Sequence, residues 1–340
     1  METLDSCIVC GYKRMTRVME AIDNQYGSHG RWTVVKCTAC SHMFLNPRPT
    51  SQEIVSYYPS GVYYTHKESI TSGGFLRNAV MEVHFGLHRK LFWFRRFFLP
   101  GLHALFARYV NILPPFSHER SLRLLDVGCG NGYLMAFFAR YGYEVWGQEI
   151  SPEAGLLARS VTPRVHIGPL EEAPFPRESF DVVIMNQVLE HVHRPLSFLQ
   201  IARSFLRPDG MLIVSVPNNA CYDARLFKES WWALQVPTHL SFFTPASLEL
   251  TLNKAGFVVK QWGFSGAYKG YSKNALQTNF RYLRENSRLL HKWSSLRFIF
   301  ETIKILSNIV LVKPLLLLGS LGIPRLWSDR MTCYAVLEEH

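Results

Sequence analysis

The fold is decided by residues 124–134, which read Leu-Leu-Asp-Val-Gly-Cys-Gly-Asn-Gly-Tyr-Leu. The apolar start of this stretch is typical of a buried parallel strand, and the apolar residues 134–138 favour a helix. Between them, three alternating glycines allow a sharp turn and let a ligand approach the backbone without a Cβ in the way. The helix that follows begins with free N–H groups. Strand, glycine turn and helix together predict a nucleotide-type binding site.

The glycine spacing differs from the dinucleotide fingerprint G-x-G-x-x-G/A. The third glycine comes one position early, and Tyr133 occupies the place of the small residue. With Asp126 two residues before the first glycine, the stretch resembles motif I of the class I S-adenosylmethionine (SAM)-dependent methyltransferases. A plain structural turn is the alternative. The resemblance implies that the turn binds the methionine and ribose part of the cofactor through Asp126, Gly128, Cys129, Gly130 and Gly132.

Composition limits the partners and the compartment. The chain has 340 residues, 48% of them hydrophobic, which suits one large α/β domain with a small addition. The net charge of +11 favours a negatively charged partner: nucleic acid, an anionic membrane surface or a phosphorylated substrate. No signal peptide is recognisable at the polar N-terminus. We expect a cytoplasmic protein, with peripheral contact at the inner face of an anionic membrane as an alternative.

Two CxxC pairs predict a metal site near the N-terminus. Each pair places two thiolates on one tight turn, and a small residue follows it. The segment between the pairs has strand character around residues 32–36, as in a zinc ribbon. A redox role for the pairs is the alternative. Four thiolates leave no open coordination position, so we expect structural zinc rather than a catalytic metal. The predicted ligands are Cys7, Cys10, Cys37 and Cys40.

A tyrosine cluster follows the ribbon. The Asn-Pro-Arg-Pro element at residues 46–49 precedes Tyr57-Tyr58, then Tyr63 and Tyr64. A zinc ribbon, this element and tyrosines ahead of a methyltransferase domain resemble bacterial sugar and glycan-biosynthesis methyltransferases, the sugar C-methyltransferases most closely. In that class the N-terminal module covers the substrate side. The resemblance makes Tyr63 and Tyr64 candidate substrate contacts; ordinary packing is equally compatible with their sequence.

Two further segments combine aromatic, apolar and basic residues. Residues 75–116 and 266–328 both favour amphipathic helices, and their charges and prolines argue against a membrane span. A helical lid and cap is one interpretation, and contact with an anionic membrane or a lipid-linked substrate is the other. We predict five segments: a zinc-ribbon and substrate-side module (1–60), a helical lid and linker (61–120), a methyltransferase core (121–265), a helical cap (266–328) and the last core strand (329–340).

The remaining cofactor residues follow later strands. Glu149 ends the predicted second strand, about 20 residues after the glycine turn, where an acidic residue accepts hydrogen bonds from ribose hydroxyls. Relatives often carry Asp after the third strand to bind the adenine amino group. Here Pro169 stands in its place, which leaves adenine to the backbone and apolar packing. The additional predicted cofactor contacts are Ile150, Leu170, Asn186 and Gln187.

Two histidines are candidates for general base. His191 follows strand four within Leu-Glu-His-Val, a pattern shared across this methyltransferase group, and it could act as a base or orient a loop. His239 lies between aromatic clusters in a long loop at the predicted active-site edge. The sugar methyltransferases carry an acidic residue before this histidine, whereas this chain has Thr238. The base would then lack that carboxylate partner.

These observations predict a doubly wound, Rossmann-like α/β fold with a seven-stranded sheet. The family resemblance implies the strand order 3-2-1-4-5-7-6. We expect methyl transfer from SAM to a small-molecule or saccharide acceptor, such as a sugar nucleotide or lipid-linked saccharide. The alternatives are an RNA-modifying methyltransferase and a non-catalytic scaffold. No basic stripe with stacking aromatics stands apart from the apolar helices, which argues against nucleic acid.

Overall fold

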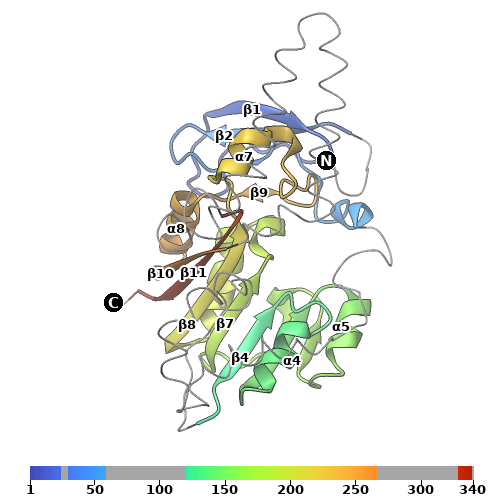
Figure 1. Ribbon diagram of the computed structural model, residues 1–340, viewed down its shortest axis with the longest axis vertical. Helices are drawn as coiled ribbons and strands as arrows, with labels where there is room; N and C mark the ends of the chain where they lie inside the picture. The colour runs from blue at the N-terminus through green and yellow to red at the C-terminus, as the bar shows by residue number, and fades with distance from the viewer. Residues whose placement is uncertain (24–29, 59–119, 266–327, 339–340) are drawn as a thin grey trace, which may run out of the picture.

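The structure is a computed structural model that describes residues 1–23, 30–58, 120–265 and 328–338 (Figure 1). Within these ranges the chain forms a seven-stranded sheet and a four-stranded sheet. Tyr63, Tyr64 and nearly all of the predicted helical lid and cap lie outside the described residues. Their assignments therefore remain predictions.

The seven-stranded sheet has the predicted order. Its strands follow one another as β6-β5-β4-β7-β8-β11-β10, which is 3-2-1-4-5-7-6 when they are counted along the chain. The first five are parallel, while β11 is antiparallel to both of its neighbours. The doubly wound fold with a reversed final hairpin is thus confirmed. The strands are β4 (Arg123–Val127), β5 (Glu144–Glu149), β6 (Val165–Ile167), β7 (Phe180–Asn186), β8 (Leu206–Pro217), β10 (Phe257–Ser265) and β11 (Arg330–Leu337).

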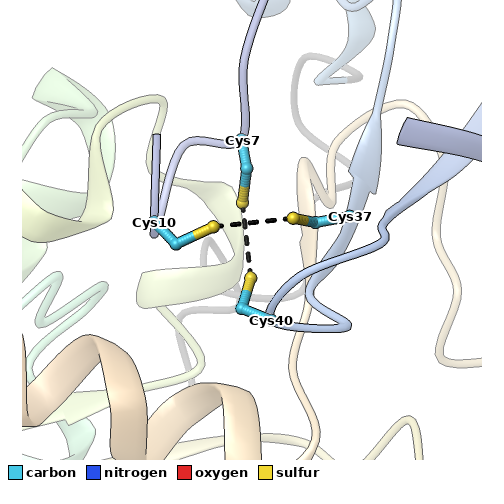
Figure 2. Close-up of side chains that lie close together, drawn as sticks. All are labelled: Cys7, Cys10, Cys37 and Cys40. Carbon is cyan, nitrogen blue, oxygen red and sulfur yellow. Dashed lines mark hydrogen bonds between the residues drawn. The ribbon is translucent and has the colours of Figure 1, made fainter. Parts of the chain in front are cut away.

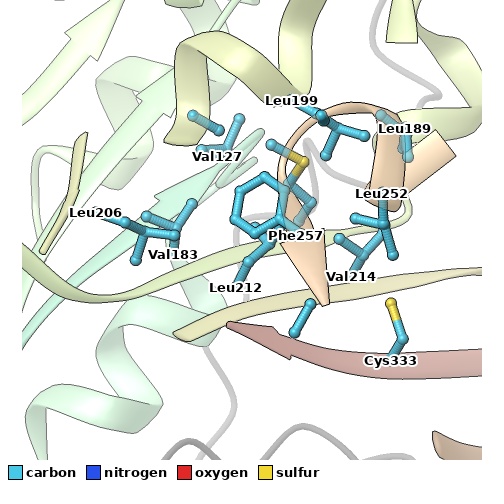
Figure 3. Close-up of a cluster of buried hydrophobic side chains, with 14 of the residues drawn as sticks. Val127, Val183, Leu189, Leu199, Leu206, Leu212, Val214, Leu252, Phe257 and Cys333 are labelled. Carbon is cyan, nitrogen blue, oxygen red and sulfur yellow. The ribbon is translucent and has the colours of Figure 1, made fainter. Parts of the chain in front are cut away.

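Helices cover both faces of this sheet. Successive strand residues point to opposite faces, so Leu125 and Val183 pack on one side while Leu124 and Val182 pack on the other. The first side faces α6 (Pro195–Phe205) and α8 (Pro245–Lys254), and Figure 3 shows part of its core. The second side faces α4 (Tyr133–Ala139) and α5 (Pro152–Ala158). Burial on both faces explains why β7 is a nearly unbroken apolar run.

Short helical segments connect these elements. They lie mostly after the carboxyl ends of strands, where the sequence predicted the binding site. These segments are η1 (Ile54–Tyr57), η4 (Leu170–Glu172), η5 (Leu189–His191), α7 (Tyr222–Phe227) and η6 (Lys228–Ser230).

One strand boundary differs from the sequence-based expectation. Residues 207–210, Arg-Pro-Asp-Gly, are typical turn residues and favour a strand that begins only at Met211, but β8 begins at Leu206. Leu206 pairs with Phe180 and Met211 pairs with Val182, so the four residues between them bulge out of the ladder. The turn-forming residues 207–210 therefore lie within β8 as a bulge and not in a loop before it.

The four-stranded sheet joins the N-terminal module to the core. Its antiparallel order is β1-β2-β3-β9, with β1 (Met15–Ala21), β2 (Trp32–Cys37) and β3 (Met43–Leu45) from the N-terminal region. The last strand, β9 (Ser241–Phe242), comes from the loop after β8. Figure 1 shows this sheet, with α7 beside it, at one end of the molecule. The predicted module at residues 1–60 thus shares its sheet with the core.

Candidate functional site

The glycine turn connects β4 to α4 in left-handed backbone conformations. The φ angles of Gly128, Gly130 and Gly132 are +67°, +56° and +81°, in a region that residues with a Cβ adopt at a cost. A Cβ on Gly128 would lie 2.6 Å from Val188 Cγ2, and one on Gly132 would lie 3.0 Å from Ala158 Cα. The turn therefore needs glycine at these positions for conformation and for space.

The carboxylate of Glu149 joins the glycine turn to the end of β5. Gly130 N–H donates to Glu149 Oε2 at 2.7 Å, and Ser151 N–H donates to Glu149 Oε1 at 2.9 Å. Each carboxylate oxygen can accept a further hydrogen bond. Two residues predicted to bind the same cofactor are thus brought together by the fold.

Gln148 is a site residue that the sequence analysis missed. Its Oε1 accepts from Gly128 N–H at 3.2 Å, and its Nε2 donates to Gly168 O at 2.7 Å. The side chain is buried and therefore fixes the turns after β4 and β6 relative to each other. The strand reads Glu-Val-Trp-Gly-Gln-Glu, and nothing in it distinguishes Gln148 from an ordinary polar strand residue.

Asp126 lies under the glycine turn at 2% exposure. Burial, reinforced by the nearby charge of Glu149, raises the pKa of Asp126 to about 8. Cys129 is also buried, and burial raises the pKa of its thiol well above the ordinary range. Both side chains face the protein interior.

The other predicted cofactor residues differ in exposure. Ile150 is 70% exposed beside Glu149, whereas Leu170 is buried in the core at 1% exposure. Asn186 ends β7, and its buried Oδ1 has no hydrogen-bond partner within the described residues. Gln187 has a φ of +60°, and both its N–H and its Nε2 donate to Ser215 O. This strained backbone lies at the carboxyl edge of the sheet.

Both predicted base candidates lie in one cluster with Glu190. The rings of His191 and His239 are 4.6 Å apart between centroids, and each Nδ1 lies within hydrogen-bond distance of a backbone carbonyl. Burial lowers the pKa of His191 to about 4, and burial with the neighbouring His191 lowers that of His239 far below its usual range. Burial also raises the pKa of Glu190 to about 8. The cluster therefore holds two neutral imidazoles.

The N-terminal module reaches this cluster. The hydroxyl of Tyr58 lies 3.0 Å from Nδ1 of His191. Leu240, next to His239, donates its N–H to Glu190 O at 2.8 Å, and its own carbonyl accepts from Leu45 N–H at 3.0 Å. The position of the cluster thus depends on contacts with the N-terminal region.

The four predicted metal ligands converge on one point (Figure 2). Cys7 Sγ lies 3.6 Å from Cys40 Sγ, and Cys10 Sγ lies 3.5 Å from Cys37 Sγ. Sulfur atoms around zinc in a tetrahedron lie roughly 3.8 Å apart at ordinary Zn–S lengths. The donor set and its spacing therefore fit zinc. Each CxxC pair is followed by a residue with positive φ, Gly11 at +76° and Ser41 at +61°.

The catalytic region matches known methyltransferases. A family model described as a methyltransferase domain matches residues 101–261. The chain contains a class I SAM-dependent methyltransferase domain. Among the described residues, none of the helices has the length and apolarity needed to cross a bilayer.

Curated relatives match this methyltransferase domain. The chain is 33% identical over 165 residues to a ubiquinone biosynthesis O-methyltransferase of Cereibacter sphaeroides, covering 45% of this chain and 66% of that protein. A protein of the same name from Azorhizobium caulinodans is 31% identical over 154 residues, covering 42% and 61%. The chain thus spans less than two thirds of the length of these relatives.

The methyltransferase domain also resembles solved structures. One is the 1,6-didemethyltoxoflavin-N1-methyltransferase of Burkholderia thailandensis, at 16% identity and a TM-score of 0.41, with coverage of 89% of this chain and 98% of that one. Likeness at this level carries no functional argument, so the site residues are considered on their own geometry.

Proposed function

We propose that this protein transfers the methyl group of SAM to a small-molecule acceptor. The main support is the hydrogen bond from Gly130 N–H to Glu149, which joins the glycine turn to an acidic strand end. The two groups lie at the carboxyl edge of adjacent parallel strands, where α/β sheets bind ligands. The methyltransferase domain match supports the same reaction.

The residues present fit SAM. Ile150 exposes a large apolar side chain directly beside Glu149, a surface that an adenine ring would cover. When bound, SAM would supply the reactive sulfonium methyl group. Glu149 would accept hydrogen bonds from the ribose and Ile150 would pack against the base, whereas the Leu170 side chain, predicted to do the same, is buried in the core and has no surface for it. The methionine part would contact Gly128, Gly130 and Gly132, with Asn186 and Gln187 at the same edge of the sheet. The buried side chains of Asp126 and Cys129 would support the turn and not contact the cofactor.

We assign acceptor alignment to the cluster around His191 and His239. Both imidazoles are neutral because burial lowers the pKa of each ring. A neutral imidazole has a nitrogen lone pair that can accept a hydrogen bond or a proton from an acceptor group, and the lowered pKa makes each ring a weaker base than free histidine. His239 and His191 are thus the proposed catalytic residues, and Tyr63 and Tyr64 remain proposed substrate contacts.

Two observations bear on the chemical class of the acceptor, and they favour different classes. The curated relatives are named as O-methyltransferases of ubiquinone biosynthesis, which favours a small aromatic acceptor. The Asn-Pro-Arg-Pro element and the tyrosine cluster favour a sugar nucleotide or a lipid-linked saccharide. We propose the saccharide as the narrower acceptor, with structural zinc in the four-cysteine site. The two CxxC pairs, which suit metal binding in a reducing compartment, support a cytoplasmic protein, and the net charge of +11 supports contact with an anionic membrane surface.

Two measurements test this function. Isothermal titration of the full chain with SAM should give saturable binding; no binding would reject the proposal. Radiolabelled methyl transfer from SAM should then be compared between sugar nucleotides and catechol-type phenols. Label appearing only on phenols would retain methyl transfer and reject the saccharide acceptor.

A further inference from the structure

Glu190 carries a buried carboxylate in η5, and the positive charge of Arg330 acts on it. Its side chain lies in a residue that is 1% exposed, and neither oxygen has a hydrogen-bond partner within the described residues. Burying a polar group without compensation costs several kcal/mol, and more when the group is charged. Structures retain such a group when something else satisfies it. The imidazoles of His191 and His239 lie close by, since one ring nitrogen of each is within 4.8 Å of a Glu190 oxygen.

Both imidazoles direct Nδ1 toward a backbone carbonyl, which leaves Nε2 as the nitrogen that can bind a ligand. His191 Nδ1 lies 2.9 Å from Thr238 O, and His239 Nδ1 lies 3.0 Å from Ala233 O. A carbonyl oxygen can only accept, so each Nδ1 carries the hydrogen. Each Nε2 then keeps its lone pair. Backbone carbonyls orient metal-binding histidines in this way.

We propose that Glu190, His191 and His239 form a second metal site, for a divalent transition-metal ion. One ligand atom from each residue lies within 4.8 Å of the other two. Two imidazoles and one carboxylate suit Mn²⁺, Fe²⁺, Co²⁺ or Zn²⁺, whereas Mg²⁺ and Ca²⁺ prefer oxygen ligands. Three protein ligands leave coordination positions open, unlike the four thiolates of the ribbon.

The ligands are held in place before any ion binds. Glu190 and His191 lie in η5, while His239 comes from the loop before β9. The hydrogen bond from Leu240 N–H to Glu190 O fixes these two segments at 2.8 Å. Because the three side chains need little rearrangement, little of the metal-binding free energy is lost to ordering them.

The site has a consequence for the reaction, and this step rests on the proposed function. An open coordination position beside the methyl-transfer site would bind and polarise an acceptor oxygen. An Nε2 that ligates a cation cannot accept a proton at the same time. Metal ligation and the base role are therefore alternatives for the same nitrogen atoms.

Manganese binding tests the site directly. The full chain, purified with zinc in the four-cysteine site, is treated with a mild chelator and titrated with Mn²⁺. The electron paramagnetic resonance signal of free Mn²⁺ reports binding. We expect one equivalent to bind to wild type, and Zn²⁺ to displace it. Glu190→Gln and His239→Gln should each weaken Mn²⁺ binding at least about tenfold.

The matched control is Glu249→Gln, the same exchange at an exposed position of α8. It should bind Mn²⁺ like wild type. Absence of Mn²⁺ binding to wild type, or equal binding by folded Glu190→Gln, would overturn the site. Circular dichroism establishes folding; if one variant unfolds, the other decides. Titration of the same samples with SAM is a separate measurement from Mn²⁺ binding. Failure to bind SAM would therefore reject the proposed function and leave the conclusion about the metal site unchanged.

Discussion

Comparing Gly132→Ala with Gly142→Ala separates two energetic reasons for glycine in the turn: its left-handed backbone and its close packing. Gly132 has a φ of +81°, and an added Cβ would lie 3.0 Å from Ala158 Cα and 3.1 Å from Val161 Cγ2. Gly142 has nearly the same φ, +86°, but an added Cβ would meet nothing within 4 Å. The left-handed conformation costs about 1–2 kcal/mol in both variants. Overpacking against the backbone of α5 adds about 1–3 kcal/mol for Gly132→Ala alone.

Urea denaturation measures the difference. Gly142→Ala should lose about 1–2 kcal/mol of unfolding free energy, and Gly132→Ala about 2–5 kcal/mol, with unchanged m-values. Gly132→Ala should also weaken SAM binding in a calorimetric titration, whereas Gly142→Ala should not. Equal destabilisation by the two substitutions would show that α5 can shift to accommodate the added Cβ at no energetic cost. The argument that close packing demands glycine at position 132 would then be wrong.

Three further predictions concern charge and metal. Because the pKa of Asp126 is raised from 3.8 to about 8, the stability it contributes at low pH is lost as pH rises through this range, up to about 6 kcal/mol. Asp126→Asn should flatten that slope in urea titrations between roughly pH 5 and pH 8; a parallel slope would contradict it. Glu149→Gln should weaken SAM binding about 10–100-fold, as expected for loss of charged hydrogen bonds, measured by calorimetry; unchanged affinity would remove Glu149 from the site. Cys37→Ser should lower bound zinc, measured by mass spectrometry, and lower the melting temperature; full zinc content would exclude Cys37 as a ligand.

The sheet order was predictable because its signals are local. The mostly apolar runs of β4 and β7 mark buried parallel strands, and the glycine turn fixes where β4 ends. The family resemblance then supplied the order, and the structure confirms it. The short turn at residues 207–210 misled the prediction of β8, because the bulge is set by pairing with β7 rather than by turn residues.

The side-chain cluster could be predicted only in part. The sequence analysis named His191 as a candidate base because it follows the predicted fourth strand, within Leu-Glu-His-Val. It could not show that His239 meets His191, since β9 has only two residues and no periodic pattern. Glu190 brings a carboxylate oxygen within 4.8 Å of a ring nitrogen of His239, but among the described residues neither of its oxygens makes a hydrogen bond. The positive φ of Gln187 and the polar bridge of Gln148 likewise depend on tertiary contacts.

The shared sheet has a consequence for synthesis of the chain. β3 leaves the ribosome long before β9, its partner, has been made. Until then β3 is an unpaired edge strand, which is the kind of surface that pairs with other chains. Non-local strand pairing is also slow. Metal capture by the four cysteines could order the nascent ribbon early, so zinc supply during translation would influence how much of the chain escapes aggregation.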